Sequence, residues 1–463
     1  MDQPSGRKYG NRGRRLGIRL HELEEQLDSF NSSTRRAALE EIVKLVQSGQ
    51  IDVPPTKAEV NIHYHSFYSF NANGWSPSRI VWEAKKYGLE VAGIVDFDVL
   101  DGMEEFLSAG EILDIKTVVG LETRVFIKEL AEHVMSSPNE PGIAYFMASG
   151  CFKLPPTGSE AEQTLQLMAK MARLRNIAVM QRVNDYLNHV QLDYEADVIP
   201  LTPSGNATER HLLTAYDRKA REVFPNDEHL VRFWSDRLGL TADETESLIS
   251  NTSKFHEVMR SKLMKLGGVG YVPPDSESFP SIEEAVAMIR GMEALPTIAW
   301  LDGTNSGEAD IHAFLSLLES KGVVAINIIP DRNWNFKDPR EKAVKVAKLT
   351  EAVEAARKFG FPILVGTEMN KAGLPFVDSF QAPELQPFLG DFISGARVIY
   401  GHTLLARYAG FGYWSEGAEC EFGTNRKSKN RFFERAGTPS PNARLRQDLS
   451  TRAGQWTAKG LLL

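Results

Sequence analysis

The chain has 463 residues, of which 42% are hydrophobic and 25% charged, and its formal net charge is −8. This is the composition of an ordinary globular protein with a buried core, and the negative charge argues against a nucleic-acid partner. The two cysteines, Cys151 and Cys420, exclude a disulfide framework. No run is apolar and long enough for a signal peptide or a membrane span, so we expect a cytoplasmic protein without membrane contact.

The first 50 residues predict a tail followed by a helical hairpin. Residues 1–15 are rich in glycine and arginine and lack an apolar pattern, which predicts a disordered basic tail. Within residues 16–50, leucines, isoleucine and valines at helical spacing predict two helices, with the polar residues 31–33 between them as caps. Such a hairpin suits packing on the main domain or the assembly of a homo-oligomer.

From residue 59 onward, short apolar runs alternate with helical stretches. This alternation predicts a mainly parallel sheet, and seven or eight such units predict a closed or nearly closed α/β barrel. The expected strands are residues 60–64, 91–95, 118–127, 177–183, 297–301, 323–329, 362–365 and 397–400. The expected helices between them include residues 77–87, 282–292, 311–319 and 340–359.

Residues 155–280 interrupt the alternation and are rich in helix formers. We expect a largely helical insertion, which is either a lid over the barrel mouth or an accessory subdomain without substrate contact. The barrel then consists of residues 59–154 and 281–436. The polar residues 437–463 predict a disordered or loosely attached tail.

The strongest chemical signal is the pair His63 and His65 at the end of the first expected strand. Alternate residues of a strand point to the same side, so the two imidazoles lie side by side. Barrel active sites are built at the carboxyl ends of the strands, and two neutral imidazoles there can hold Zn, Mn or Fe.

Acidic residues end three further strands: Asp96 and Asp98 after one, Glu122 after the next and Glu368 after a late one. Taken singly, each is explained by a helix cap or a loop salt bridge. Carboxylates behind buried strands are costly unless they are paired or bind a metal. Four strand ends that converge on one barrel mouth therefore favour a metal site.

The order of these motifs resembles the PHP (polymerase and histidinol phosphatase) superfamily over residues 59–400. It is most similar to PHP phosphoesterases that act on nucleoside monophosphates or bisphosphates and carry a helical insertion. The resemblance implies a distorted TIM-like (β/α)7 barrel with up to three metal ions. It also implies hydrolysis of phosphate esters by a metal-activated water.

Carried over residue by residue, the resemblance leaves one complete metal position. His63 and His65 match the first motif, Glu122 matches the bridging glutamate, and Glu368 is a longer substitute for the final acid. Histidines of the other positions are missing: Phe97 and Trp300 stand where the family has ligands, Phe70 stands near another, and Asn370 replaces the last histidine. We therefore expect a single divalent ion in a dry site.

Further polar residues are candidates for the reaction itself. Asp96 or Asp98 would orient the attacking water or act as general base, and His402 would be a base or an added ligand. Arg210 and His211 lie in the insertion where related phosphoesterases hold phosphate, and Asn370 follows the last acidic motif. The alternatives stay open that Arg210 and His211 begin a surface helix and that His402 is structural.

We expect a metal-dependent hydrolase of the phosphoesterase type, with a small-molecule substrate such as a phosphate ester. Two alternatives remain. The first is a catalytically inactive PHP-fold protein for binding or assembly, motivated by the missing histidines. The second is a hydrolase or lyase for a non-phosphate substrate, because the phosphate clamp is the eroded part of the motif set.

Overall fold

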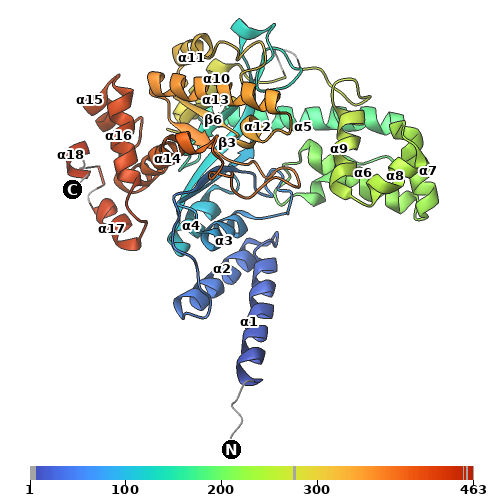
Figure 1. The fold of residues 1–463 in the computed structure, drawn as a ribbon, viewed down its shortest axis with the longest axis horizontal. Helices are drawn as coiled ribbons and strands as arrows, with labels where there is room; N and C mark the ends of the chain where they lie inside the picture. Colours follow the sequence, from blue (N-terminus) through green and yellow to red (C-terminus); the bar gives the residue numbers. More distant parts are fainter. Residues whose placement is uncertain (1–6, 275–277, 452, 455–456, 462–463) are drawn as a thin grey trace, which may run out of the picture.

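The computed structural model describes residues 7–274, 278–451, 453–454 and 457–461, and its centre is a single sheet of seven strands (Figure 1). The strands follow one another in chain order across the sheet. They are β1 (Val60–Tyr64), β2 (Val91–Phe97), β3 (Lys116–Phe126), β4 (Ile143–Ser149), β5 (Leu295–Trp300), β6 (Ala325–Ile328) and β7 (Ile363–Val365). Neighbours pair in parallel, except that β4 is antiparallel to both β3 and β5.

The sheet curls into a nearly closed barrel, as the alternation of strands and helices predicted. Tyr64 of β1 forms a parallel bridge with Glu368, just beyond β7. The backbone amide of His65 donates to the carbonyl oxygen of Glu368 at 2.8 Å, and the amide of Glu368 donates to the carbonyl oxygen of His63 at 2.7 Å. The first and last strands thus meet beside the two histidines.

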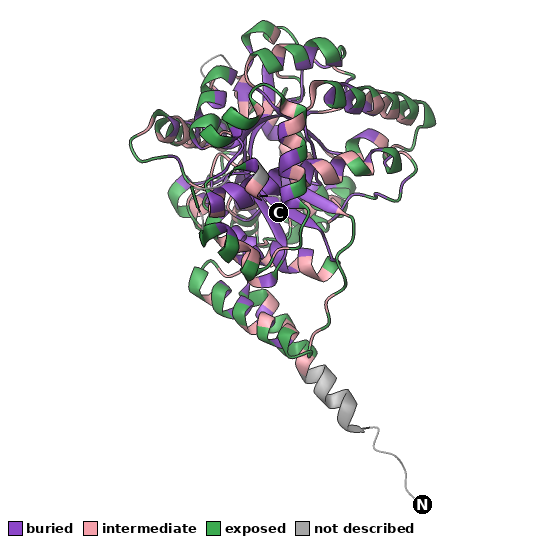
Figure 2. Cartoon of the chain, turned by 90° about the vertical axis from the view of Figure 1, so that its left-hand side faces the viewer, coloured by how far each residue is buried: buried purple, intermediate pink, exposed green. Residues whose placement is uncertain are grey.

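Helices cover the outside of the barrel, while the strands themselves are almost entirely buried (Figure 2). The covering helices are α3 (Pro77–Tyr87), α4 (Met103–Leu113), α10 (Ile282–Gly291), α11 (Ile311–Ser320) and α13 (Pro339–Phe359). Helix α3 illustrates why they form where the sequence predicts. Ser76 caps its start, Pro77 occupies the first turn, and Gly88 ends it in the left-handed conformation.

Two of the expected strands are helical in the structure. Residues 177–183 belong to α5 (Glu160–Leu187), and residues 397–400 belong to α14 (Leu389–Ala409). A short apolar run does not distinguish a buried strand from a buried helix. Helix α14 is buried on several sides, from Val398 to Ala406 without interruption, so its sequence lacks helical periodicity.

The N-terminal hairpin consists of α1 (Arg7–Gln26) and α2 (Ser32–Gln47), with Asn31 as the cap of α2. Helix α2 packs on α3 and α4, and α1 projects away from the barrel (Figure 1). The prediction of a disordered tail over residues 1–15 was too long, because residues 7–15 are helical; residues 1–6 lie outside the described part.

The insertion forms a helical lobe with its own hydrophobic core, around Tyr216, Trp234 and Phe255. Besides α5 it contains α6 (Glu209–Val223), α7 (Asp227–Leu238), α8 (Ala242–Ile249) and α9 (Thr252–Met259). A π-helical turn, η4 (Arg260–Met264), follows directly on α9. The lobe lies to one side of the barrel in Figure 1.

The C-terminal region is more ordered than predicted. It contains α15 (Glu416–Phe422), α16 (Arg426–Gly437), α17 (Ala443–Thr451) and α18 (Ala458–Leu461). Residues 437–463, which were expected to form a tail, therefore contain the two helices α17 and α18. Helix α17 packs on α14 and buries Leu449. Among the described helices, none is long and apolar enough to cross a membrane.

Candidate metal centre

The side chains of His63, His65 and Glu122 converge at the barrel mouth. Their ligand atoms lie within 4.8 Å of one another, and all three residues are buried. Oε2 of Glu122 is 3.1 Å from Nε2 of His65 and 3.6 Å from Nε2 of His63. None of these three atoms has a hydrogen-bond partner. Buried polar atoms are ordinarily paired, so three facing unpaired ligand atoms fit a divalent cation between them.

The opposite ring nitrogens of the two histidines are held by oxygen atoms. Nδ1 of His63 lies 3.0 Å from Oδ1 of Asn327, and Nδ1 of His65 lies 3.2 Å from Oγ of Ser69. The hydroxyl of Ser69 donates to Asp96 at 2.7 Å, so towards His65 it acts as acceptor. Each ring is thus held at Nδ1 and turns Nε2 towards Glu122, and in the neutral form Nε2 supplies the lone pair that metal ligation requires.

The charges of the cluster are arranged for a cation. Burial acts to raise the pKa of Glu122, but His63 and His65 outweigh it and lower that pKa to about 2. Burial also disfavours the charged form of His63, and the Glu122 carboxylate outweighs it, so the pKa of His63 is raised. Glu122 is therefore an ionised carboxylate, and its buried negative charge favours a cation beside the two imidazole rings.

Glu368 lies next to the cluster without joining it. Its backbone has a positive φ of 66°, and the next residue, Met369, has one of 52°. The carboxylate pairs with Nη2 of Arg332 at 2.8 Å, from the short helix α12 (Asp331–Trp334). The structure thus brings together three of the four predicted ligands. The role of Glu368 as a ligand stays a proposal.

The two predicted catalytic aspartates differ in their surroundings. Asp96 is buried and accepts hydrogen bonds from the Ser66 amide at 2.7 Å, the Ser66 hydroxyl at 2.6 Å and the Ser69 hydroxyl at 2.7 Å. Asp98 is half-buried and lines the cavity beside the cluster, and its Oδ1 accepts from Thr123 at 2.6 Å. Burial raises the pKa of both carboxyl groups. Of the two, Asp98 is the one that faces the cavity.

The apolar residues that stand at or near positions of family ligands, Phe70, Phe97 and Trp300, line the cavity beside the cluster. The ring of Phe97 stacks on His65 with centroids 4.3 Å apart and an angle of 24°. Trp300 lines the same cavity and is 2% exposed. Phe70 instead packs edge-on against His211 of the insertion, with centroids 5.3 Å apart. Phe97 thus lies directly against His65, and Trp300 lines the cavity that the cluster borders.

A cavity of about 710 Å³ lies between the barrel mouth and the insertion. Its barrel wall includes His63, Glu122 and Asn370, and its insertion wall includes Arg210 and Arg175. Of the two interpretations of the insertion, the one in which it covers the barrel mouth agrees with this lining. Arg210 is paired with Glu257 across the insertion wall.

The other two predicted histidines have structural surroundings. His211 caps α6, where its Nδ1 accepts from the Thr208 amide at 3.0 Å. In His402, Nε2 lies 3.1 Å from the carbonyl oxygen of Gly150, and Nδ1 accepts from the Tyr413 amide at 2.9 Å. Neither residue lines the cavity.

The position of His402 follows from the fold. Gly150 comes directly after Ser149, which pairs with Leu295 at the start of β5. His402 therefore lies near the amino-terminal end of β5, opposite the mouth. It was predicted to follow a strand, but it is part of α14.

Sequence reasoning missed Asn327 and Ser69, which orient the two histidine ligands. Asn327 is a buried polar residue within the apolar strand β6, and this contrast is visible in the sequence. Ser69 carries no such signal, because serine is common in the loop after a strand.

A nearly closed α/β barrel with a buried His-His-Glu cluster at its mouth defines a candidate metal-binding protein. Residues 61–198 match the family model of the PHP domain. The family thus agrees with the resemblance that the motifs carry.

The relatives either match only a short part of this chain or have a low sequence identity to it. Error-prone DNA polymerases of Mycobacterium bovis and Mycobacterium tuberculosis are each 33% identical over 94 residues, which is 20% of this chain and 8% of the polymerase. The chain thus spans a small fraction of these relatives. The solved structure of an amidohydrolase from Chromobacterium violaceum, with bound sulfate and no metal, has 15% identity and a TM-score of 0.45, covering 71% of this chain and 96% of that one.

Proposed function

We propose that the chain is a metal-dependent hydrolase of phosphate esters, with one divalent ion held by His63, His65 and Glu122. The observation that carries the proposal is the convergence of three buried ligand atoms without hydrogen-bond partners at the wall of a large cavity. Zn, Mn or Fe suits a donor set of two imidazoles and a carboxylate. Glu368 would become a fourth ligand by leaving Arg332.

The cations of the cavity support an anionic substrate. The lining includes Arg124, Arg175, Arg260, Lys265 and Arg332. Most of these are already paired; Arg260 and Lys265, for example, both contact Glu209, at 2.7 and 3.0 Å. Arg175 is the exception, because its Nη1 is buried without a hydrogen-bond partner. A guanidinium in that state is suited to bind a phosphate oxygen.

The residues around the centre have distinct proposed roles. When bound, a divalent ion supplies Lewis-acid chemistry and lowers the pKa of a water molecule. Asp98, whose second carboxylate oxygen is free of the Thr123 contact, would take a proton from the attacking water. Arg175 would bind the phosphate, and Phe97 and Trp300 would keep bulk water from the reacting groups.

Turnover on a panel of phosphate monoesters and diesters tests this proposal. We expect activity in the chain reconstituted with Zn²⁺ or Mn²⁺ and none after chelation. His63→Ala should abolish turnover, whereas His21→Ala, at a side chain 74% exposed on α1, should preserve it. Equal turnover in the chelated protein would overturn the proposal.

A second candidate function is binding or assembly without turnover. Two observations favour it: the stacking of Phe97 on His65 and the pairing of Glu368 with Arg332. Phe97 fills space beside His65, and the Glu368 carboxylate is engaged by Arg332, so fewer positions around a bound ion are open to water or substrate. Metal binding without turnover on the phosphoester panel would support this candidate. Hydrolysis restricted to non-phosphate esters or amides would instead support the alternative of a hydrolase for a non-phosphate substrate.

A further inference from the structure

The loop of residues 66–71, here called the His65 loop, determines how ligand His65 is held. It follows β1 directly. Ser69 contacts Nδ1 of His65 at 3.2 Å, and the side-chain amide of Asn71 donates to the carbonyl oxygen of His65 at 2.8 Å. Ser66 and Ser69 also anchor the loop to buried Asp96. A shift of this loop would therefore turn the imidazole of His65 away from Glu122.

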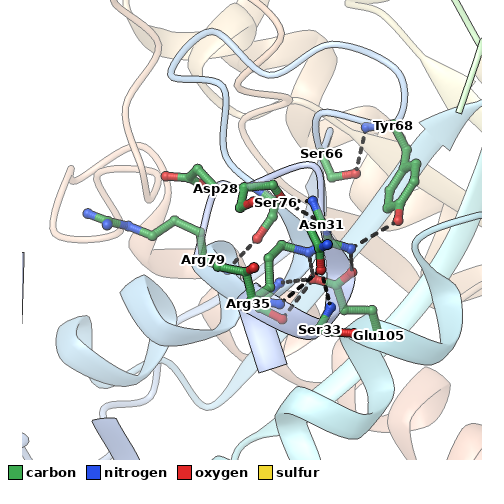
Figure 3. A network of polar contacts seen from close by, with 12 residues as sticks. Asp28, Asn31, Ser33, Arg35, Ser66, Tyr68, Ser76, Arg79 and Glu105 are labelled. Atoms are coloured by element: carbon green, nitrogen blue, oxygen red, sulfur yellow. Dashed lines mark hydrogen bonds and ion pairs between the residues drawn. The ribbon is translucent and has the colours of Figure 1, made fainter. Parts of the chain in front are cut away.

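The N-terminal hairpin contacts this loop through buried Arg35 and through Phe30, whose ring packs edge-on against Phe67 with centroids 5.6 Å apart. Arg35 of α2 is 1% exposed. Its Nη2 donates to the hydroxyl of Tyr68 at 3.2 Å, and its guanidinium lies 5.1 Å from the ring centroid of Phe67. Figure 3 shows Arg35 between Glu105 and Tyr68. The arginine thus contacts two adjacent residues of the His65 loop.

The same guanidinium is fixed from two further directions. Its Nε donates to Oε1 of Glu105 on α4 at 2.9 Å, and Nη2 forms a second contact with that carboxylate. Its Nη1 donates to the carbonyl oxygen of Ser29, in the turn of the hairpin, at 2.7 Å. The planar, bidentate geometry of arginine suits this set of partners, and a lysine could not reproduce it.

The insertion holds the loop from its other side. The side-chain amide of Asn206 donates to the carbonyl oxygens of Tyr68, at 3.0 Å, and of Phe97, at 2.9 Å. Tyr68 is therefore contacted by the hairpin through its hydroxyl and by the insertion through its backbone. The loop that orients His65 lies where three parts of the chain meet.

We propose that Arg35 is a positioning residue of the metal centre, through which the N-terminal hairpin fixes the His65 loop and hence the imidazole of His65. This inference rests on the proposed metal site. Arg35 acts at a distance from the cluster, since the residues of the His65 loop that it contacts are Phe67 and Tyr68 and neither is a proposed ligand. Residues that hold metal ligands in place typically change metal affinity about 10- to 100-fold when altered.

Binding of Co²⁺, followed by its visible absorption spectrum, tests the inference without any assay of activity. Arg35→Lys keeps the charge but loses the bidentate geometry, and Tyr68→Phe removes only the hydroxyl. We expect Co²⁺ affinity to fall about tenfold in each, with an altered absorption band. Arg36→Lys is the matched control, because Arg36 is the next residue of α2, is 74% exposed and contacts Glu40 at 3.0 Å.

One further measurement, hydrogen exchange, reports on the loop itself. Hydrogen exchange of residues 66–71 should be faster in Arg35→Lys than in Arg36→Lys. If Arg35→Lys fails to fold, the Co²⁺ affinity and spectrum of Tyr68→Phe test the positioning role instead. Unchanged Co²⁺ affinity, spectrum and exchange in a folded Arg35→Lys or Tyr68→Phe chain would overturn the role of Arg35 while leaving the metal centre intact. Failure of the unsubstituted chain to bind Co²⁺ would instead overturn the metal centre itself, and the positioning role with it.

Discussion

The two walls of the cavity differ in how their polar groups are satisfied. On the barrel wall, the ligand atoms of His63, His65 and Glu122 face one another without hydrogen bonds. On the insertion wall, charged groups are largely paired within the wall, as Arg210 is with Glu257. A charged group that is already paired has little capacity left to bind a ligand, whereas an unpaired buried group can form a new contact with one. The difference places the proposed chemistry on the barrel wall, with Arg175 as the exception opposite.

The largest expected effect is on the barrel wall. Glu122→Gln keeps the shape of the side chain but removes the charge that the two imidazoles share. We expect metal affinity to fall by more than about 100-fold, because outer positioning residues alone account for up to that amount. Competition with a chelator of known affinity measures the change. Glu129→Gln, at an exposed residue, is the control; similar affinities in the two variants would contradict the assignment.

The next largest effect is expected at Arg175, the unpaired cation of the insertion wall. Arg175→Met should raise KM for a phosphate ester roughly 10- to 100-fold, the loss expected for a hydrogen bond to a charged group. Its kcat should change less. Arg173→Met, two residues away on α5 and paired with Glu195 at a 41% exposed side chain, is the matched control. An unchanged KM would show that the substrate anion binds elsewhere.

A smaller effect on the barrel wall is expected at Asn327, which orients the imidazole of His63. Asn327→Ala removes the acceptor of the Nδ1 proton of His63 and frees the ring to rotate. Metal affinity should decrease about tenfold while turnover at saturating metal stays closer to normal. Isothermal titration with Zn²⁺ separates the two quantities. Affinity equal to that of the unsubstituted chain would show that packing alone orients His63.

The smallest effect concerns the histidines that lie away from the barrel wall. Burial lowers the pKa of both His211 and His402 to about 4. Since an unfolded histidine has a pKa of about 6.5, the unfolded chain binds more protons between these values. The free energy of unfolding should therefore decrease as the pH falls from about 6.5 to 4, by at most ~1.4 kcal/mol per pH unit for each histidine.

Urea unfolding of the metal-free chain at several pH values measures this dependence. His402→Gln should show a shallower slope than the unsubstituted chain. His21→Gln is the control at an exposed position. Equal slopes in the two variants would contradict the assignment of His402 as a buried neutral residue.

The sequence predicted that His63, His65 and Glu122 lie together because much of this signal is local. His63 and His65 share a face of one strand, and the order of strands in a barrel brings Glu122 beside them. The sequence did not predict the pairing of Glu368 with Arg332, since that contact joins the segment after β7 to the short helix α12, which are adjacent only in the folded barrel.

The errors in the fold have a physical cause in burial. Helix α14 is surrounded by apolar neighbours, so its residues read as a strand, and His402 was placed after a strand end that does not exist. The C-terminal helix α17 is mostly polar and is held by the packing of Leu449, which a tail-like composition does not reveal. The insertion, in contrast, keeps helical signals such as the Thr241 capping box that starts α8.

Elemental analysis of metal content per chain tests the central claim most directly. The purified chain, loaded with Zn²⁺ or Mn²⁺ and then freed of unbound metal, should retain about one ion. His63→Ala should retain almost none, while His21→Ala should match the unsubstituted chain. No retained metal in the unsubstituted chain, or equal amounts in His63→Ala, would contradict a metal centre formed by His63, His65 and Glu122.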